Sequence, residues 1–219
     1  MTLVLHPPAT AAAYAAATAT ASRLALLRAR PRRAGEASFF FYDSHFKSDA
    51  VKVLPGEYFV HTDNILITTT LGSCIAACLW DRVARVGGMN HFMLPEGRSG
   101  SGRYGAYAME VLINEMMKLG ATRPTLEAKL FGGAQVMDGM DTLNIGERNT
   151  EFAIRYLEAE HIQMVSNDVR GPYPRKLCFL PASGKAMVKR LAAAHPDALA
   201  PRPRSALPAD AEAGTVDLF

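Results

Sequence analysis

Between residues 39 and 194, short apolar blocks alternate with polar breaks, and the blocks predict both strands and helices. Ile65–Leu71 is β-branched and apolar, which favours a buried strand. Ile75–Trp80 and Val86–Leu94 flank the polar break Asp81–Arg85, a pattern that favours a hairpin. A helix over the first arm is the alternative, because Ser73 can cap it. Further strands are predicted at Val51–Leu54, Glu57–His61, Leu126–Phe131, Ile162–Val165 and Lys176–Leu180.

Three segments have the periodicity of helices. Tyr104–Leu119 carries an apolar face, and the following Gly120 is a residue that commonly ends helices. Asn149–Glu160 is predicted as a second helix with Asn149 as its N-cap, and Ser183–Ala194 as a third. Because helices and strands are interspersed and hairpins also occur, we expect an α/β (α+β) layered sandwich of mixed β-sheets flanked by helices.

The composition changes at both ends of this region. Residues 1–38 are rich in alanine and arginine and predict a disordered or low-complexity N-terminal extension, with an organelle transit peptide as a less favoured interpretation. Residues 39–194 are predicted to form a single domain. Residues 195–219 are rich in proline, alanine and aspartate, which predicts a disordered C-terminal tail.

The overall composition is that of a globular protein, with 49% apolar and 21% charged residues among 219. A net charge of +3 is too small to favour nucleic acid as a partner. No apolar run reaches the roughly 18 to 20 residues that a membrane span needs. Three cysteines, Cys74, Cys78 and Cys178, argue against a disulfide framework and favour a reducing compartment.

Candidate chemistry gathers on the predicted hairpin, where Gly72 and Ser73 lead into Cys74. If the tight turn centres on Arg82 and Val83, Cys74 lies directly opposite His91. Directly opposed residues have Cβ atoms about 4.5 to 5.5 Å apart, whereas a slip of one residue would place them on opposite faces. The imidazole could then activate the thiol for acyl transfer from an amide or ester through a thioester.

Such chemistry needs supporting groups. Backbone N–H groups around Gly72 and Ser73 could stabilise an oxyanion, and Asn90 is a further candidate for binding the substrate or the oxyanion. A neighbouring hydroxyl or amide must orient the imidazole, and Thr68, Thr69, Thr70 and Asn90 are the candidates from this stretch.

Structural interpretations compete with these. A free cysteine often packs as a small apolar residue, and this is the favoured interpretation of Cys78 and Cys178. Cys74, Cys78 and His91 do not match a usual zinc spacing, so no metal site is predicted. Gly132–Gly133 lacks the residues that complete a phosphate-binding motif, so a tight turn is favoured there and no cofactor is predicted.

Several longer segments carry a family resemblance from about Phe40 to Leu191. They read LGSCIAACLWD, GGMNHFMLP, RYGAYAMEVLIN, AKLFGGAQV and NIGERN, followed by the region from Asn167 to Lys176. This pattern resembles the chemoreceptor glutamine deamidase family, CheD. The resemblance implies a cytoplasmic enzyme that hydrolyses specific glutamine side-chain amides of methyl-accepting chemotaxis receptors to glutamate and releases ammonia.

The resemblance also implies catalytic residues, a fold and a possible partner. The family's catalytic cysteine and histidine fall on Cys74 and His91, and its threonine, six residues before the cysteine, falls on Thr68, with Thr69 as the weaker candidate. The implied fold resembles that of the cytotoxic necrotizing factor deamidases. In some members the phosphatase CheC binds the deamidase, and that partner is not assumed here. A non-catalytic regulator that binds receptors or a phosphatase is the alternative function, and a cysteine peptidase or transglutaminase is a second enzymatic one.

Overall fold

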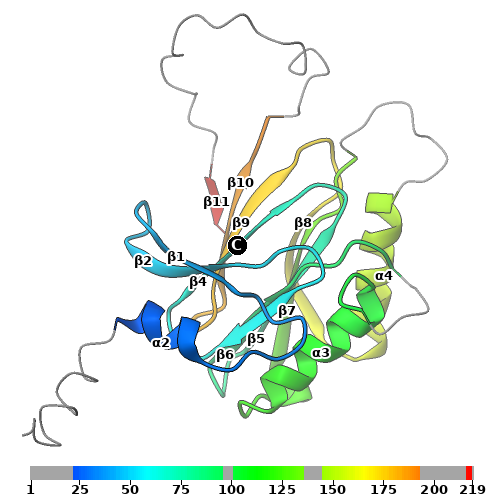
Figure 1. Cartoon of the computed structure of the whole chain (residues 1–219). Coiled ribbons are helices and arrows are strands. Elements are labelled where there is room, and N and C mark those ends of the chain that lie inside the picture. Colours follow the sequence, from blue (N-terminus) through cyan, green and yellow to red (C-terminus); the bar gives the residue numbers. More distant parts are fainter. Residues whose placement is uncertain (1–21, 96–100, 136–144, 193–215, 219) are drawn as a thin grey trace, which may run out of the picture.

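The computed structural model describes residues 22–95, 101–135, 145–192 and 216–218, and these form two packed β-sheets with two long helices on one side (Figure 1). The six-stranded sheet has the order β1-β2-β4-β9-β10-β11, and the five-stranded sheet has the order β3-β6-β5-β7-β8. Each sheet contains a parallel pair, β2–β4 and β7–β8, among antiparallel neighbours. The predicted layered α/β architecture with mixed sheets is confirmed.

The strands have the following bounds. In the six-stranded sheet they are β1 Phe39–Asp43, β2 Ser48–Lys52, β4 Leu66–Leu71, β9 Arg175–Leu180, β10 Lys185–Arg190 and β11 Val216–Leu218. In the five-stranded sheet they are β3 Tyr58–His61, β5 Ile75–Asp81, β6 Val86–Asn90, β7 Leu126–Gly132 and β8 Gln163–Val169.

Two helices cover the outer face of the five-stranded sheet, α3 Gly105–Met117 and α4 Ile145–Ala159 (Figure 1). Both were predicted, although α4 begins four residues before its predicted start at Asn149. One apolar cluster fills the layer between these helices and the sheet, and it includes Leu79, Phe92, Met109, Leu112, Phe152 and Leu157. No described helix has the length and apolar character needed to cross a membrane.

A second apolar cluster lies between the two sheets and includes Phe59, Ile67, Leu71, Cys78, Phe131 and Phe179. Strand β5 therefore contacts apolar layers on both faces, which explains its nearly continuous apolar sequence. Of the catalytic candidates, Cys74 immediately precedes β5 and His91 immediately follows β6.

The β5–β6 hairpin is confirmed, but its register differs from the predicted one. Cys78 pairs with Met89 and Asp81 with Val86, so the loop runs over residues 82–85. The Asp81 carboxylate accepts hydrogen bonds from the N–H groups of Val83 and Ala84, both at 2.8 Å, which holds this four-residue loop. The prediction that Cys74 directly faces His91 is therefore wrong.

The observed register is shifted by two residues, which keeps both side chains on one face of the hairpin. Ile75 bridges to Phe92, so the next pair outward is Cys74 with Met93, and His91 lies diagonally from Cys74. Diagonal neighbours in a sheet are separated by about 7 to 8 Å. The face they share points toward the layer between the sheets, because Cys74, Cys78 and Met89 all contact that cluster.

The predicted helix over Ser183–Ala194 is wrong, because Lys185–Arg190 forms strand β10 and pairs with β9. Buried Ala186 and Val188 are two positions apart and alternate with more exposed residues, which is the period of a strand. Gly184, with a φ of +67°, completes the turn between β9 and β10.

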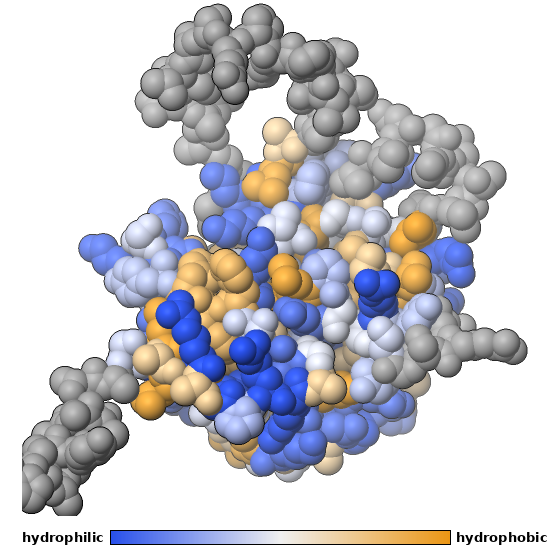
Figure 2. All heavy atoms as spheres, viewed as in Figure 1, coloured by the Kyte–Doolittle hydropathy of each residue, from blue (hydrophilic) through white to orange (hydrophobic). Residues whose placement is uncertain are grey.

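Each predicted tail includes one described element of secondary structure. Residues 22–38 include the short helix α2 Arg23–Ala29, the side chain of Leu27 is buried, and Ala37 donates a backbone hydrogen bond of 2.9 Å to Tyr58. At the other end, β11 pairs with β10. Residues 1–21, 195–215 and 219 lie outside the described part. Apolar residues gather on the surface near α2 and β1 (Figure 2), where Leu26 and Phe39 are exposed.

Candidate functional site

Cys74 lies in the short connection between β4 and β5. Three successive backbone carbonyls of this connection accept hydrogen bonds from neighbouring groups. The carbonyl of Gly72 accepts a hydrogen bond from the N–H of Ala134, and that of Cys74 accepts one from Gly133, both at 2.8 Å. The Ser73 carbonyl accepts one from the Asn149 side chain at 3.0 Å. The nucleophile candidate is therefore presented by a fixed segment rather than a free loop.

The Cys74 thiol is half-buried, and burial raises its pKa, while its own backbone N–H acts in the opposite direction. The other two cysteines are buried, and burial raises the pKa of each thiol. All three are free thiols. At neutral pH the resting Cys74 is consequently a thiol, and an attack on a carbonyl would need a base.

His91 follows β6, and its backbone is bonded to the segment before β3. Its N–H donates to the Glu57 carbonyl at 3.0 Å, and its carbonyl accepts from Gly56 at 2.7 Å. The side chain is 2% exposed. Burial lowers the pKa of His91 to about 4, although the nearby Val53 carbonyl partly opposes this effect. The imidazole is therefore neutral at pH 7.

The hydrogen bonds of Thr69 determine which nitrogen of His91 carries the proton. The Thr69 hydroxyl lies 2.7 Å from the Val53 carbonyl, which can only accept, so the hydroxyl donates its single proton there. Toward His91 Nδ1, at 2.9 Å, the same oxygen must therefore accept. Nδ1 then carries the proton, and Nε2, which is buried without a hydrogen-bond partner among the described residues, has its lone pair free.

Among the described residues, no hydrogen bond joins Thr68 to His91. Its hydroxyl donates to the Leu177 carbonyl at 3.0 Å and lies 3.7 Å from the Cys178 sulfur, on the other face of β4. The assignment of the imidazole-orienting threonine to Thr68 thus disagrees with the geometry, and the weaker candidate, Thr69, occupies that position. Strand alternation contained the signal, since Thr69 shares its parity with Ile67 and Leu71, which face the layer between the sheets.

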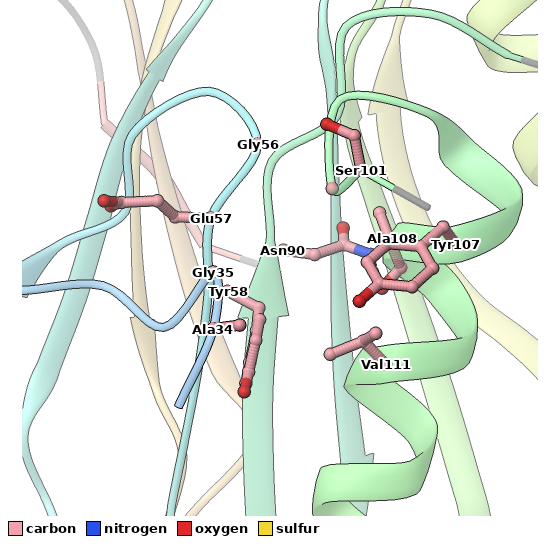
Figure 3. Close-up of a pocket in the computed structure, with 11 residues that line it drawn as sticks. Ala34, Gly35, Gly56, Glu57, Tyr58, Asn90, Ser101, Tyr107, Ala108 and Val111 are labelled. Carbon is pink, nitrogen blue, oxygen red and sulfur yellow. The ribbon is translucent and has the colours of Figure 1, made fainter. Parts of the chain in front are cut away.

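Asn90 was a candidate for binding the substrate or oxyanion, but it lies on the helix side of β6. Its Oδ1 accepts from the Ala77 N–H at 3.0 Å, and its Nδ2 donates to the Ala108 carbonyl of α3 at 3.1 Å. Figure 3 shows this side chain directed toward Ala108. The bonds of Asn90 join α3 to the five-stranded sheet, away from the face that Cys74 and His91 share.

A cavity of about 270 Å³ lies on that helix side, and its lining includes Tyr58, Asn90, Tyr107 and Val111 (Figure 3). Neither Cys74 nor His91 lines it. Within the described ranges, no three His, Cys, Asp or Glu side chains are grouped as metal ligands would be.

A buried ion pair that the sequence interpretation did not predict joins β8 to β9. Arg175, paired with Leu71 in the β4–β9 ladder, donates to Asp168 Oδ1 at 2.9 Å and to the Tyr173 carbonyl at the same distance. Burial raises the pKa of Asp168, but Arg175 outweighs this effect, so the pKa lies below its ordinary value. The pair holds the β8–β9 turn, whose Gly171 carbonyl accepts from Gln135 at 2.9 Å.

Most of this chain is similar in sequence to known proteins. Residues 93–190 match the sequence profile of a family described as CheD chemotactic sensory transduction. A probable chemoreceptor glutamine deamidase, CheD 1, of Albidiferax ferrireducens is 56% identical over 204 residues, which cover 90% of this chain and 87% of the relative. This chain belongs to the CheD family. A probable CheD deamidase of Methylobacillus flagellatus is 47% identical over 84% of this chain and 96% of its own length.

The protonation state of Cys74 can be tested by alkylation. Because the thiol and the imidazole are both neutral at rest, alkylation of Cys74 by iodoacetamide should be slow near pH 7 and rise steadily toward pH 10. Peptide mass spectrometry after timed alkylation measures this rate, with buried Cys78 and Cys178 as internal controls. Fast alkylation on a plateau between about pH 5 and 7 would instead reveal a thiolate–imidazolium pair.

Proposed function

We propose that this protein is a protein-glutamine deamidase of chemotaxis, which hydrolyses specific glutamine side-chain amides of methyl-accepting chemotaxis receptors to glutamate and releases ammonia. Family membership supports the reaction, since the relatives are named as probable chemoreceptor glutamine deamidases. The observation that carries the chemistry is the placement of Cys74 and His91 on one face of the hairpin, with an unpartnered Nε2 on a neutral imidazole.

The first step is attack by Cys74 on the amide carbonyl. As the thiol turns toward the diagonal His91, Nε2 takes its proton, and the sulfur forms a bond to the carbonyl carbon of the glutamine side chain. Developing imidazolium charge is shared along Nδ1–H to Thr69 and on to the Val53 carbonyl. Burial disfavours a charged imidazole, so His91 is charged only transiently and returns the proton readily.

The tetrahedral intermediate carries a negative oxygen, which requires donors in fixed positions. The backbone N–H of Cys74 lies beside its own sulfur, and the carbonyls of Gly72, Ser73 and Cys74 are all bonded. We assign the N–H groups of Ser73 and Cys74 as the oxyanion donors, with Gly72 permitting close approach. One such donor is worth about 10²- to 10³-fold in rate.

Collapse of the intermediate breaks the carbon–nitrogen bond and leaves a thioester on Cys74. His91 donates the proton it took from the thiol to the leaving nitrogen, which departs as ammonia. Nε2 then removes a proton from water as the water oxygen attacks the thioester, and the sulfur leaves with that proton. The products are a glutamate side chain and the original thiol, so the cycle needs no cofactor.

Thr69, in place of Thr68, is the third member of this constellation. Its single hydroxyl proton is committed to the Val53 carbonyl, so it acts as an acceptor that holds the imidazole in the tautomer with a free Nε2. Three free cysteines support a reducing compartment, and we place the reaction in the cytoplasm, without requiring CheC. The two mixed sheets with helices on one face also support a relation to the cytotoxic necrotizing factor-type deamidase fold.

Incubation with a receptor cytoplasmic fragment tests the reaction. Each deamidated glutamine gains about 1 Da, because an amide becomes an acid. Intact-mass and peptide mass spectrometry should show this gain at specific glutamines with wild-type protein and with the control Cys78→Ala, whose cysteine packs in the core. The gain should vanish with Cys74→Ala. A folded wild-type protein that binds the fragment without changing its mass would favour the non-catalytic regulator instead.

Valine substitutions of the two threonines test the orienting contact. Valine keeps the shape of threonine and removes the hydroxyl, so Thr69→Val should lower kcat by about 100-fold or more through loss of the productive tautomer. Thr68→Val should change kcat by less than about threefold, because its hydroxyl lies on the other face of β4. Ammonia release from the receptor fragment measures both, with thermal melts confirming that each variant is folded. The opposite order of effects would return the role to Thr68.

A further inference from the structure

The side chain of Asn149, on α4, joins the two backbone segments that carry Cys74 and His91. Its Nδ2 donates to the Ser73 carbonyl at 3.0 Å and to the Met93 carbonyl at 2.9 Å. Ser73 precedes the nucleophile, and Met93 follows the base by two residues. Asn149 is fully buried, so water does not compete for these bonds.

The orientation of the Asn149 amide follows from the chemistry of its partners. Both are backbone carbonyls, which can only accept, so the nitrogen must face them. With both hydrogens engaged, the Oδ1 atom is left buried without a hydrogen-bond partner among the described residues. An orphaned buried acceptor is unfavourable, and an apolar residue at this position would avoid it.

These two bonds occur where the β5–β6 ladder ends. Ile75 and Phe92 exchange the last pair of backbone hydrogen bonds, at 3.0 and 3.1 Å. Beyond them, the Met93 N–H donates to Arg103, and the Cys74 carbonyl accepts from Gly133. The next pair that a continued ladder would bond is Ser73 with Leu94, but Leu94 bonds Arg103 and Gly105 instead, and the Ser73 carbonyl accepts from Asn149.

Close packing of α4 against Gly133 supports this connection. Gly146, in the first turn of α4, allows the helix to approach Gly133 so closely that an added Cβ would lie 2.5 Å from the Gly133 carbonyl oxygen. Gly133 in turn bonds the Cys74 carbonyl. The predicted role of Asn149 as a helix N-cap does not hold, since α4 begins at Ile145 and places this residue in its second turn.

We propose that Asn149 is a positioning residue for the deamidation reaction, which sets the separation of Cys74 and His91 by holding Ser73 and Met93 together. This inference rests on the proposed function, and it gives a role to the last residue of the NIGERN segment. Asn149 acts through the two backbones and touches no reacting atom. Misplacement of reacting groups by about 1 Å can lower a rate about 100-fold.

Two substitutions test this role. Asn149→Asp keeps the shape but turns a carboxylate oxygen toward two carbonyls, and Asn149→Leu removes both donors together with the orphaned acceptor. In each variant, kcat on the receptor fragment should fall by about 30- to 100-fold while KM changes less than about threefold. Asn114→Asp, at an exposed position of α3, is the matched control and should keep wild-type kinetics. A folded Asn149→Leu protein with kcat within threefold of wild type would overturn the proposal.

Cysteine alkylation gives a second readout that does not depend on turnover. Release of the Ser73 carbonyl should loosen the segment before Cys74, so Asn149→Leu should raise its alkylation rate at pH 8 by about fivefold or more. Cys78 and Cys178 should keep their wild-type rates. Equal acceleration of all three cysteines would indicate general destabilisation and contradict a local positioning role.

The two readouts also separate failure of this inference from failure of the proposed function. A wild-type protein that leaves receptor glutamines unchanged refutes the deamidase proposal, whereas the alkylation comparison still decides whether Asn149 holds the segment. Asn149→Ser keeps one donor and serves if Asn149→Leu does not fold. Its kcat should fall by about tenfold, and an unchanged kcat would overturn the proposal.

Discussion

Burial of the His91 imidazole between the two sheets is the constraint on which the site depends. His91 is the residue after β6 of the five-stranded sheet, whereas the hydrogen-bond partner of its ring, Thr69, belongs to β4 of the six-stranded sheet. The apolar layer around it lowers the imidazole pKa, and the bond to Thr69 selects the tautomer. A base of this kind is neutral at rest, so in the proposed mechanism the Cys74 thiol is activated during attack and no thiolate is stored.

The proposed nucleophile, Cys74, depends on the same layered packing. Strand β5 is buried on both faces, and the segment before it is bonded through successive carbonyls to Ala134, Asn149 and Gly133. These three groups come from the end of β7 and from α4, which is part of the helical layer. The helical layer thus contributes to the site by fixing the backbone that presents the thiol.

Sequence alone predicted the layered architecture, the central hairpin and helices α3 and α4, because each has a strong apolar periodicity of its own. The β10 segment was misread because alanine, lysine and methionine favour helices, and only pairing with β9 makes a strand of it. The hairpin register depended on the side-chain bonds of Asp81, which lengthen the loop. A sequence pattern does not determine such a local contact.

Some residues of the candidate site could likewise be predicted from the sequence, and others could not. Cys74 and His91 stand in distinctive motifs, and their shared face survived an error of two residues in the register. The choice between Thr68 and Thr69 depends on which face of β4 meets the other sheet, and strand parity was the overlooked signal. Asn149 could not be assigned from sequence, because its partners, Ser73 and Met93, are distant in the chain and meet it only through the docking of α4.

The protonation state of His91 is the central claim, and nitrogen NMR of ¹⁵N-histidine-labelled protein measures it directly. The chain has six histidines, and comparison with His91→Gln assigns the signals of interest. At pH 7 we expect a neutral ring with a protonated Nδ1 and an unprotonated Nε2. An imidazolium at that pH, or a neutral ring with its proton on Nε2, would contradict the account, because neither leaves a base free to accept the proton of Cys74.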